Sequence, residues 1–379
     1  MFRGVVVAVM SGCFCLDVWA GPDHLLWDPS VAIPRSTEIP SLVNARFTMI
    51  KRREPEKDGY NWLHGVAIVR HKNTFYSCWG HNKGAENTLT EVVQGSRSYD
   101  EGRTWSGVEM IAAGDDKTAE SHGVFLSHKG TLWLFVSNFT GWRRGTKTKA
   151  YVLSERGNEW ESRGIVAEND FWPMAEPRRM NDGNWIMPGI IVSGTYPAGV
   201  AISHGEDFTR WDVISIPQFE KIGRMWGESA VIVAENEITN IARYGAKAVA
   251  LVSTSRDFGR TWTPMCESNL PMSPSKPYAG ILSTGQRYVI GTIVADAGFK
   301  RVPLTIAVSR PGERLLRGIF CITDRTLRDN PSGAQPHLAY PYAVERDKKL
   351  YVVYSAALQS GNLNDAELAV FNVDDLKLR

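Results

Sequence analysis

Six polar residues whose side chains could carry out chemistry recur at similar places along the chain. Each opens a short unit whose pattern predicts a strand, a polar hairpin and a second apolar strand. The six are His64, His122, Glu176, Glu228, Tyr278 and Tyr340. Imidazoles, carboxylates and phenols can move protons or act as nucleophiles, and burying them costs free energy unless they line a wet, polar pocket. The pattern therefore predicts one shared site built by all six units, with Lys276 at its edge.

A second repeat indicates how the six units are arranged. Ser98–Trp105 and Ser255–Trp262 both fit the template Ser-x-Asp-x-Gly-x-Thr-Trp, and partial copies begin at Ser154, Ser203 and Ser309. In such a stretch Asp can cap the amides of a tight turn, Gly supplies a positive backbone angle and Trp anchors the outgoing strand. A period of about 50 residues with short strands in each unit is typical of a β-propeller. Six units predict six blades, whose inner strands would bring the six polar residues to one axial funnel.

The repeated turns resemble the Asp-boxes, or BNR repeats, of the sialidase superfamily. The resemblance implies an all-β fold, a six-bladed β-propeller of the sialidase type, with the boxes in a structural role away from the active site. We expect a single propeller domain over residues 21–379. A strand over Glu38–Val43 and the closing stretch Glu367–Phe371 are predicted to complete the ring.

The resemblance also assigns roles to part of the predicted site. Glu228 and Arg243, followed by the box at Ser255, are similar to a Glu and Arg pair of the family, and Tyr340, with Tyr342 as the alternative, is similar to its catalytic tyrosine. The resemblance implies a Tyr nucleophile, a Glu that acts as its base, and an Arg that is one of three clamping a substrate carboxylate. A phenol needs a neighbouring carboxylate to become a nucleophile near neutral pH, and guanidinium forks suit carboxylates. The implied activity is that of an exo-glycosidase of the exo-α-sialidase type, which hydrolyses terminal acidic sugars from glycans.

Two positions depart from the family pattern. Glu38 precedes an Ile-Pro dipeptide where the family has its first clamping Arg. Arg178 or Arg224 could supply a replacement guanidinium, and for Arg178 a salt bridge to a nearby carboxylate is the structural alternative. The family's acid/base Asp lies in a loop before the first box, and here the corresponding loop offers His81 and Glu86, of which Glu86 could serve as the acid.

The histidines leave a second activity open. His64, His81 and His122 fall on or near the predicted funnel, and each could instead make a structural hydrogen bond. The chain is similar in architecture to sialidase-like propellers that act on rhamnose–glucuronate glycans, as lyases or rhamnosidases, and rely on an axial His. In a lyase a His or Tyr would take the proton next to a uronate carboxylate, while Arg243 and Lys276 would neutralise the forming enolate.

A non-catalytic glycan-binding propeller is the third interpretation, and it would need only a polar and aromatic lining. Glu176, Tyr278 and Tyr342 are the further residues predicted to contact a glycan. The separation of Tyr340 and Glu228 discriminates the classes, because either enzyme needs the two side chains within hydrogen-bond reach, directly or through one water.

Composition narrows the remaining classes. A net charge of +2 gives no argument for nucleic acid or a membrane surface, and the absence of metal-ligand spacings or a phosphate loop predicts no cofactor. We expect a carbohydrate partner and a monomer.

The pattern of residues 1–20 predicts a signal peptide, with lipidation at Cys13 as the alternative, and hence a secreted or periplasmic protein. The basic stretch Trp142–Lys149 is interpreted as a solvated hairpin, and the remaining cysteines, Cys78, Cys266 and Cys321, as buried thiols.

Overall fold

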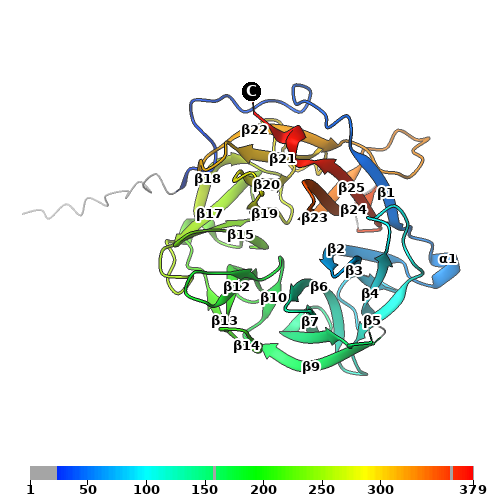
Figure 1. Ribbon diagram of the computed structural model, residues 1–379. Helices are drawn as coiled ribbons and strands as arrows, with labels where there is room; N and C mark the ends of the chain where they lie inside the picture. Colours follow the sequence, from blue (N-terminus) through cyan, green and yellow to red (C-terminus); the bar gives the residue numbers. More distant parts are fainter. Residues whose placement is uncertain (1–23, 157–158, 359–361, 379) are drawn as a thin grey trace, which may run out of the picture.

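Six β-sheets stand around a central axis in the computed structural model, which describes residues 24–156, 159–358 and 362–378 (Figure 1). Neighbouring strands within each sheet run antiparallel, and the first strand of each hairpin series lies next to the axis. The predicted all-β, six-bladed propeller is therefore confirmed. The predicted signal peptide lies outside the described residues.

The strands of each blade follow one another in chain order from the axis outward. The first blade contains β2 (Trp62–His71), β3 (Thr74–Asn82), β4 (Glu91–Ser98) and β5 (Glu109–Ala113), and the second contains β6 (Ala119–His128), β7 (Thr131–Thr140), β8 (Arg144–Leu153) and β9 (Trp160–Ala167). The third contains β10 (Phe171–Pro173) and β11 (Arg178–Arg179), which both pair with β12 (Trp185–Ile191), then β13 (Ala198–His204) and β14 (Asp207–Ser215). The fourth contains β15 (Ser229–Ala234), β16 (Glu237–Ala242), β17 (Val249–Ser255) and β18 (Cys266–Pro271), and the fifth contains β19 (Tyr278–Ile281), β20 (Arg287–Gly291), β21 (Leu304–Ser309) and β22 (Leu316–Thr323). The short helices are α1 (Pro55–Asp58), η2 (Glu220–Ile222) and η3 (Val373–Leu376).

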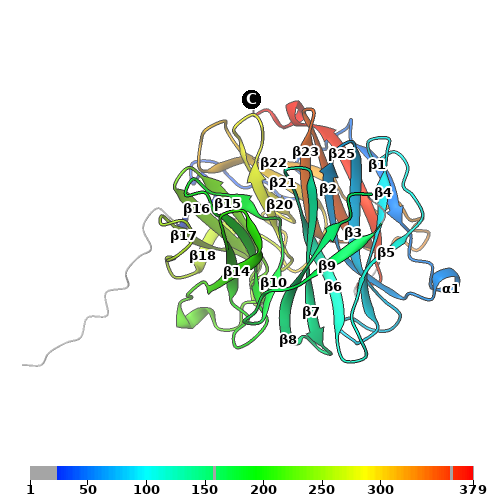
Figure 2. The ribbon, with the colours of Figure 1, turned by 60° about the horizontal axis from the view of Figure 1, so that its bottom comes forward.

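The sixth blade joins the two ends of the described chain. Its strands β23 (His337–Arg346), β24 (Lys349–Ala357) and β25 (Asp365–Asn372) are completed by β1 (Arg46–Lys51), which pairs antiparallel with β25. In Figure 1 the blue β1 lies beside the red β25, and Figure 2 shows the same neighbourhood from a second angle. The closing role predicted for the stretch at 367–371 is thus confirmed, and the ring has no open edge at this seam.

The predicted strand over Glu38–Val43 is wrong, because the closing strand begins only at Arg46. The earlier segment makes one isolated bridge, between Ser41 and Cys321 of β22. The Pro40 carbonyl accepts from the Cys321 N–H at 2.8 Å, but Pro40 has no N–H of its own to continue a ladder. The segment therefore docks on the fifth blade without becoming a strand.

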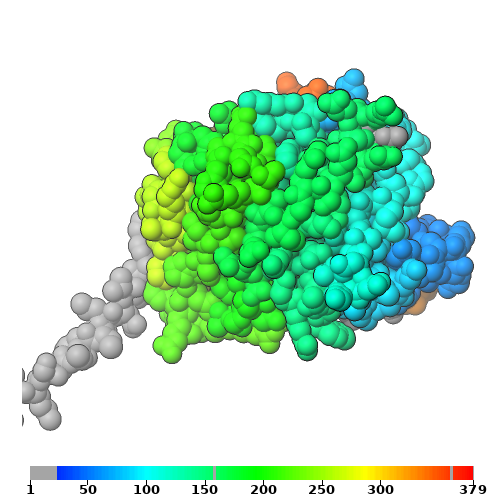
Figure 3. Space-filling model, turned by 90° about the horizontal axis from the view of Figure 1, so that it is seen from below, coloured from blue at the N-terminus to red at the C-terminus, as the bar shows by residue number. Residues whose placement is uncertain are grey.

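Consecutive blades are neighbours in space as well as in sequence. In the space-filling view of Figure 3 the outer surface passes from cyan through green to yellow, in chain order. All five box-like turns join the third and fourth strands of their blades, as expected for a structural role. The sixth blade has no box because β1, from the other end of the chain, supplies its outermost strand.

Each full Asp-box is a closed set of hydrogen bonds. In the second box the buried Ser255 hydroxyl donates to Asp257 Oδ1 at 2.9 Å and accepts the Gly259 N–H at 2.9 Å. Asp257 also accepts the N–H and the hydroxyl of Thr261, at 2.9 and 2.6 Å. The box at Ser98 repeats this arrangement. The φ angle of 78° at Gly259 explains why the template asks for glycine there.

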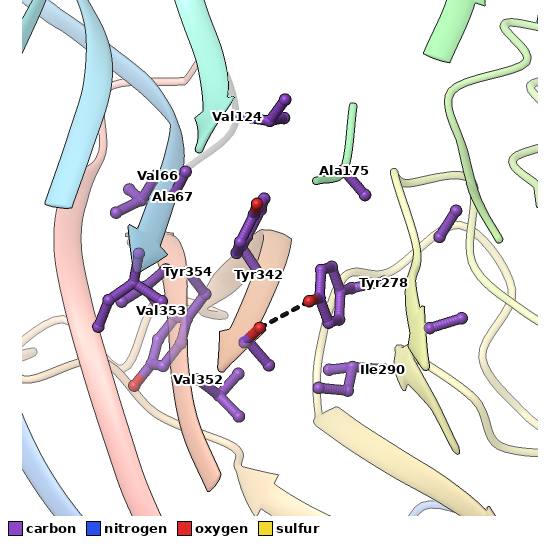
Figure 4. Packing of buried hydrophobic residues seen from close by; sticks show 14 of the residues in the cluster. Val66, Ala67, Val124, Ala175, Tyr278, Ile290, Tyr342, Val352, Val353 and Tyr354 are labelled. Atoms are coloured by element: carbon purple, nitrogen blue, oxygen red, sulfur yellow. Dashed lines mark hydrogen bonds between the residues drawn. The ribbon is translucent and has the colours of Figure 1, made fainter. Parts of the chain in front are cut away.

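The inner ends of the blades pack together below the polar site. Tyr342 of β23, Tyr278 of β19 and small or β-branched residues of β2, β6 and β24 surround the axis (Figure 4). The Tyr278 hydroxyl lies 2.6 Å from the Ala343 carbonyl oxygen, so it is satisfied despite its burial. Cys78 and Cys321 are buried and Cys266 is half-buried, each as a free thiol. The described residues contain no helix that is long and apolar enough to cross a membrane.

We predict that Ser255→Ala lowers the stability of the propeller. The change leaves the buried Gly259 N–H without its acceptor, which costs about 1–3 kcal/mol, or a fall in melting temperature of several degrees. Ser98→Ala should do the same in the first blade. Thermal unfolding checks both, with Ser332→Ala as the control, because among the described residues the Ser332 hydroxyl makes just one hydrogen bond, an exposed one to the Asn330 side chain. Equal melting temperatures for the Ser255 and Ser332 variants would contradict a structural role for the box.

Candidate active site

A cavity of about 330 Å³ opens among the inner strands and the loops that connect the blades. One part of its lining is charged or polar, and the other part is aromatic or aliphatic. The polar part consists of His64, Glu86, His122, Arg143, Glu228, Arg243, Arg301, His337, Tyr340 and Asn362. The apolar part consists of Trp172, Met174, Ile190, Val192, Tyr196 and Trp226.

Three inner strands direct side chains into this cavity by breaking their own pairing. The register shifts after His64 in β2, at His122 in β6 and at Tyr340 in β23. A β-bulge re-aims a side chain that regular alternation would place in the sheet packing. Gly65 makes room for this arrangement, because a Cβ atom there would fall 2.1 Å from the His122 ring.

Glu228 and Arg243 meet because they flank one hairpin. Glu228 directly precedes β15, and Arg243 directly follows β16. The backbone N–H of Arg243 donates to the Glu228 carbonyl at 3.0 Å. Their side chains form an ion pair in which Arg243 Nη1 lies 2.8 Å from Glu228 Oε2. The spacing of fifteen residues thus follows from the length of the hairpin.

The Tyr340 hydroxyl donates to the other Glu228 oxygen, Oε1, from the sixth blade. Burial, reinforced by the Glu228 charge, raises the pKa of Tyr340 well above its usual value. The Tyr340 phenol is therefore protonated near neutral pH, and it donates its hydrogen bond to the Glu228 carboxylate, which could take the proton. Tyr340 and Glu228 are within the reach that either enzymatic interpretation requires.

Several residues of the cavity have backbone angles that side chains rarely adopt. Tyr340 has φ 54°, Tyr196 φ 56°, Trp226 φ 57° and Arg143 φ 64°. Such angles cost free energy in bulky residues and persist where surrounding contacts hold them, often at functional sites. The strain marks this cavity independently of its chemistry.

Glu86 enters the cavity from the loop between β3 and β4, as the sequence predicted for a residue of that loop. Asn362 donates to its Oε2 at 3.2 Å. Burial raises the pKa of Glu86 above its usual value, and the charge of Arg143 opposes this rise only in part. A carboxyl group with a raised pKa can hold a proton for a leaving group.

His64 and His122 are buried in the cavity, and their lowered pKa values favour the uncharged form near neutral pH. Burial, with the charge of Lys276, lowers the pKa of His122 to about 3, and burial also lowers that of His64 well below its usual value. The Asn364 amide nitrogen donates to the Leu63 carbonyl at 2.6 Å and lies 3.1 Å from His64 Nδ1. Because that nitrogen is a donor, Nδ1 accepts and the proton of the His64 ring is on Nε2.

Three charged or titratable lining residues were not predicted for the site: Arg143, Arg301 and His337. Arg301 lies in the loop before β21, where its carbonyl accepts the Leu338 N–H at 2.8 Å and its guanidinium donates to the Pro274 carbonyl at 3.0 Å. His337 opens β23, and burial beside Arg301 lowers its pKa to about 4. Arg301 has no local motif, so the only sequence signal was the resemblance to a family that uses three arginines.

The interpretation of the stretch Trp142–Lys149 as a solvated hairpin is wrong for Arg143, because this residue lines the cavity. Its guanidinium carbon lies 5.0 Å from the centre of the Trp226 ring, and its Nε is buried without a hydrogen-bond partner among the described residues. Glu38, by contrast, lies outside the cavity lining, and its carboxylate accepts the Arg35 N–H at 2.8 Å. The three guanidinium groups of the cavity are therefore those of Arg143, Arg243 and Arg301.

Half of the predicted site residues do not line the cavity: His81, Glu176, Arg178, Lys276, Tyr278 and Tyr342. Glu176 and Arg178 form an ion pair, as the structural alternative for Arg178 required, and the Tyr278 hydroxyl lies 2.6 Å from Glu176. His81 is buried in β3, with Nδ1 on Gln94 and its ring 4.4 Å from that of Tyr60.

Lys276 is buried between the cavity and this lower cluster. Its Nζ donates to the carbonyls of Met174, at 3.2 Å, and Pro341, at 2.9 Å. Burial lowers its pKa to about 8. The ammonium group lies 5.8 Å from the centre of the Tyr340 ring, so Lys276 supports the floor of the cavity without lining it.

A six-bladed propeller with Asp-box turns and a polar axial cavity defines a protein of the sialidase type. A family model described as BNR repeat-like domain matches residues 73–352. The chain therefore belongs to this family, and it is a BNR propeller of the sialidase superfamily. No curated protein matches the sequence.

Solved structures with the same fold include several sialidases. The Hadza microbial sialidase Hz136 is 14% identical with a TM-score of 0.65, and the match covers 86% of this chain and 68% of that one. The NanB sialidase from Streptococcus pneumoniae is 13% identical with a TM-score of 0.67, over 87% and 71%. The Trypanosoma rangeli sialidase is 14% identical with a TM-score of 0.65, and the match covers 88% of this chain but only 60% of that one. At these identities the likeness shows the fold alone.

We predict that His122→Gln becomes more stable relative to the parent as the pH falls from 7 to 4.5. Unfolded His122 binds a proton near pH 6.5, whereas the folded residue does so only near pH 3, so acidification destabilises the parent through this group by at most about 1.4 kcal/mol per pH unit. The variant lacks this loss. Buried Glu91 and Glu367, whose pKa values are raised to about 8 and about 7, titrate in the opposite sense, so the difference between the two proteins is the readout. A difference in melting temperature that stays constant with pH would mean that folded His122 binds a proton as readily as the unfolded residue does.

Proposed function

We propose that the protein is an exo-acting glycosidase that removes a terminal acidic sugar from glycans. The observation that carries the proposal is the hydrogen bond from the Tyr340 hydroxyl to Glu228, whose second oxygen is held by Arg243. This arrangement suits a phenol that must lose its proton as it attacks. Export by the predicted signal peptide would bring the enzyme to glycans outside the cytoplasm.

Arg243, Arg301 and Arg143 are the groups that would bind the carboxylate of the sugar. Glu228 pairs with Arg243, and the pKa of Glu86 is raised, so Arg301 and Arg143 have no ion-pair partner among the described acids of the cavity. Guanidinium groups bind carboxylates in pairs of hydrogen bonds. The aromatic and aliphatic part of the lining, which includes Trp172, suits the less polar face or substituents of a sugar ring.

The reaction would proceed by double displacement. Glu228 takes the phenolic proton while the Tyr340 oxygen attacks the anomeric carbon, and Glu86 gives its proton to the departing glycosidic oxygen. In the second step water attacks the same carbon and gives its proton to Glu86, and the Tyr340 oxygen leaves and recovers its proton from Glu228. The configuration at the anomeric carbon is retained because it is inverted twice.

A lyase acting on uronate-containing glycans is the second candidate, and His122 is the observation that favours it. Its ring lines the cavity and makes no hydrogen bond with the described residues, so a ring nitrogen is open to a substrate, although a pKa lowered to about 3 makes this ring a weak base. His64 is less suited, since its Nδ1 already accepts a hydrogen bond. The contact between Tyr340 and Glu228 argues against a purely glycan-binding propeller, which would have no need of it.

We predict that Tyr340→Phe abolishes release of the terminal sugar, by about a thousandfold or more, because the nucleophile is lost. Binding of the acidic sugar should persist, since the three arginines remain. Mass spectrometry of products from sialylated and rhamnose–glucuronate glycans is the measurement, with Tyr342→Phe, on the same strand but outside the cavity lining, as the control. A product lighter by one water that disappears in His122→Gln would replace the hydrolase with the lyase.

We predict that Glu86→Gln slows cleavage of natural glycosides by about 10²–10⁴-fold, as expected for loss of a general acid. An aryl glycoside with a good leaving group needs less protonation, so its cleavage should fall much less. Comparing kcat on the two substrates is the test. Equal losses on both would remove Glu86 from the role of acid and leave it as a binding residue.

A further inference from the structure

The outer part of the cavity holds an aromatic pair with two arginines on it. The rings of Tyr196 and Trp226 lie 4.5 Å apart between centres. The guanidinium carbon of Arg224 lies 4.4 Å from the centre of the Tyr196 ring and 4.7 Å from that of Trp226, and Arg143 lies over Trp226 as well. We call these four residues the arginine–aromatic cluster.

The backbone holds the two rings in place. The Met225 N–H donates to the Thr195 carbonyl and the Gly227 N–H donates to the Tyr196 carbonyl, both at 2.9 Å, on either side of Trp226. Gly245 allows this packing, because a Cβ atom there would fall 2.7 Å from the Trp226 ring. Tyr196 and Trp226 adopt their left-handed backbone angles within these contacts. The cluster is thus formed before any ligand arrives.

The charges of the cluster are not neutralised by the protein. Neither Arg143 nor Arg224 forms an ion pair with an acid among the described residues, and the buried Arg143 Nε has no hydrogen-bond partner there. Other arginines of this fold do pair with an acid, as Arg97 does with Glu109. Both guanidinium groups lie over the same Trp226 ring, and two unpaired positive charges held near one aromatic side chain are complementary to an anion.

We propose that the arginine–aromatic cluster is a second subsite, which binds a further acidic sugar of the same glycan. The carboxylate or sulfate of this sugar would bind Arg224, whose guanidinium group lies over Tyr196 and Trp226. Tyr196, Trp226 and Arg143 line the same cavity as Tyr340, so this sugar would be next to the one whose bond is cleaved. The inference rests on the proposed function for the placement of the terminal sugar, and it makes the substrate a glycan with two neighbouring acidic residues.

The test is a set of binding measurements in the Tyr340→Phe background, which prevents turnover. The probes are disaccharides with a terminal sialic acid or glucuronic acid joined to galactose, galacturonate or galactose 6-sulfate. We expect at least about tenfold tighter binding of one acidic second sugar than of galactose, as for one charge-assisted contact. The galacturonate and sulfate arms distinguish the two sources of charge.

The variant Arg224→Ala should remove this preference while leaving the affinity for free terminal sugar unchanged. Lys221→Ala is the matched control, because it removes an exposed positive charge from the same segment without touching Trp226. Equal affinities for all three second sugars, or a preference that survives Arg224→Ala, would overturn the inference, as would an equal loss in Lys221→Ala. Because the readout is a ratio of dissociation constants, it stands apart from turnover: if the active chain releases no sugar from any probe, the proposed function fails while the subsite is still judged by the ratio.

Discussion

The pairing of β1 with β25 is the constraint on which the rest of the structure depends. It joins residues more than 300 positions apart, with Arg46 opposite Val370, and it completes the sixth blade. Once the ring is closed, six inner strands must share one axis, and their side chains compete for a small central volume. The inner strands of three blades are short, and those of the other three blades are long and contain bulges.

The bulges in the long inner strands direct polar side chains into the cavity. His64, His122 and Tyr340 leave the sheet packing at the register shifts and face one cavity, while a hairpin of the fourth blade presents Glu228 and Arg243. A buried carboxylate is costly unless donors surround it, and Glu228 has donors from two blades. Glu228, which accepts the hydrogen bond of the Tyr340 hydroxyl, therefore also links the fourth blade to the sixth.

The lining of the cavity combines charged and apolar side chains. Arginines from three different loops or hairpins line it, and the third blade supplies Trp172, Ile190 and Val192. Such a lining suits a ligand with a carboxylate and a less polar ring face, and Arg224 adds a further guanidinium group over Tyr196 and Trp226. Burial, together with the nearby positive charges of Arg301 and Lys276, lowers the pKa values of the cavity histidines, so that positive charge in the cavity is left to the arginines.

The sequence by itself determined the blades and the central part of the site. The period of the boxes and the six hairpin units are visible because turn chemistry and hairpin length are local properties, whereas the resemblance to the sialidase superfamily linked Glu228, Arg243 and Tyr340. The tertiary structure alone decided which polar residues share the cavity. Arg301 and Arg143 reach it from loops without a motif, whereas Lys276 and Tyr278 lie below it and His81 faces Gln94 instead, because loop paths and bulges, rather than position at a strand start, set where a side chain points.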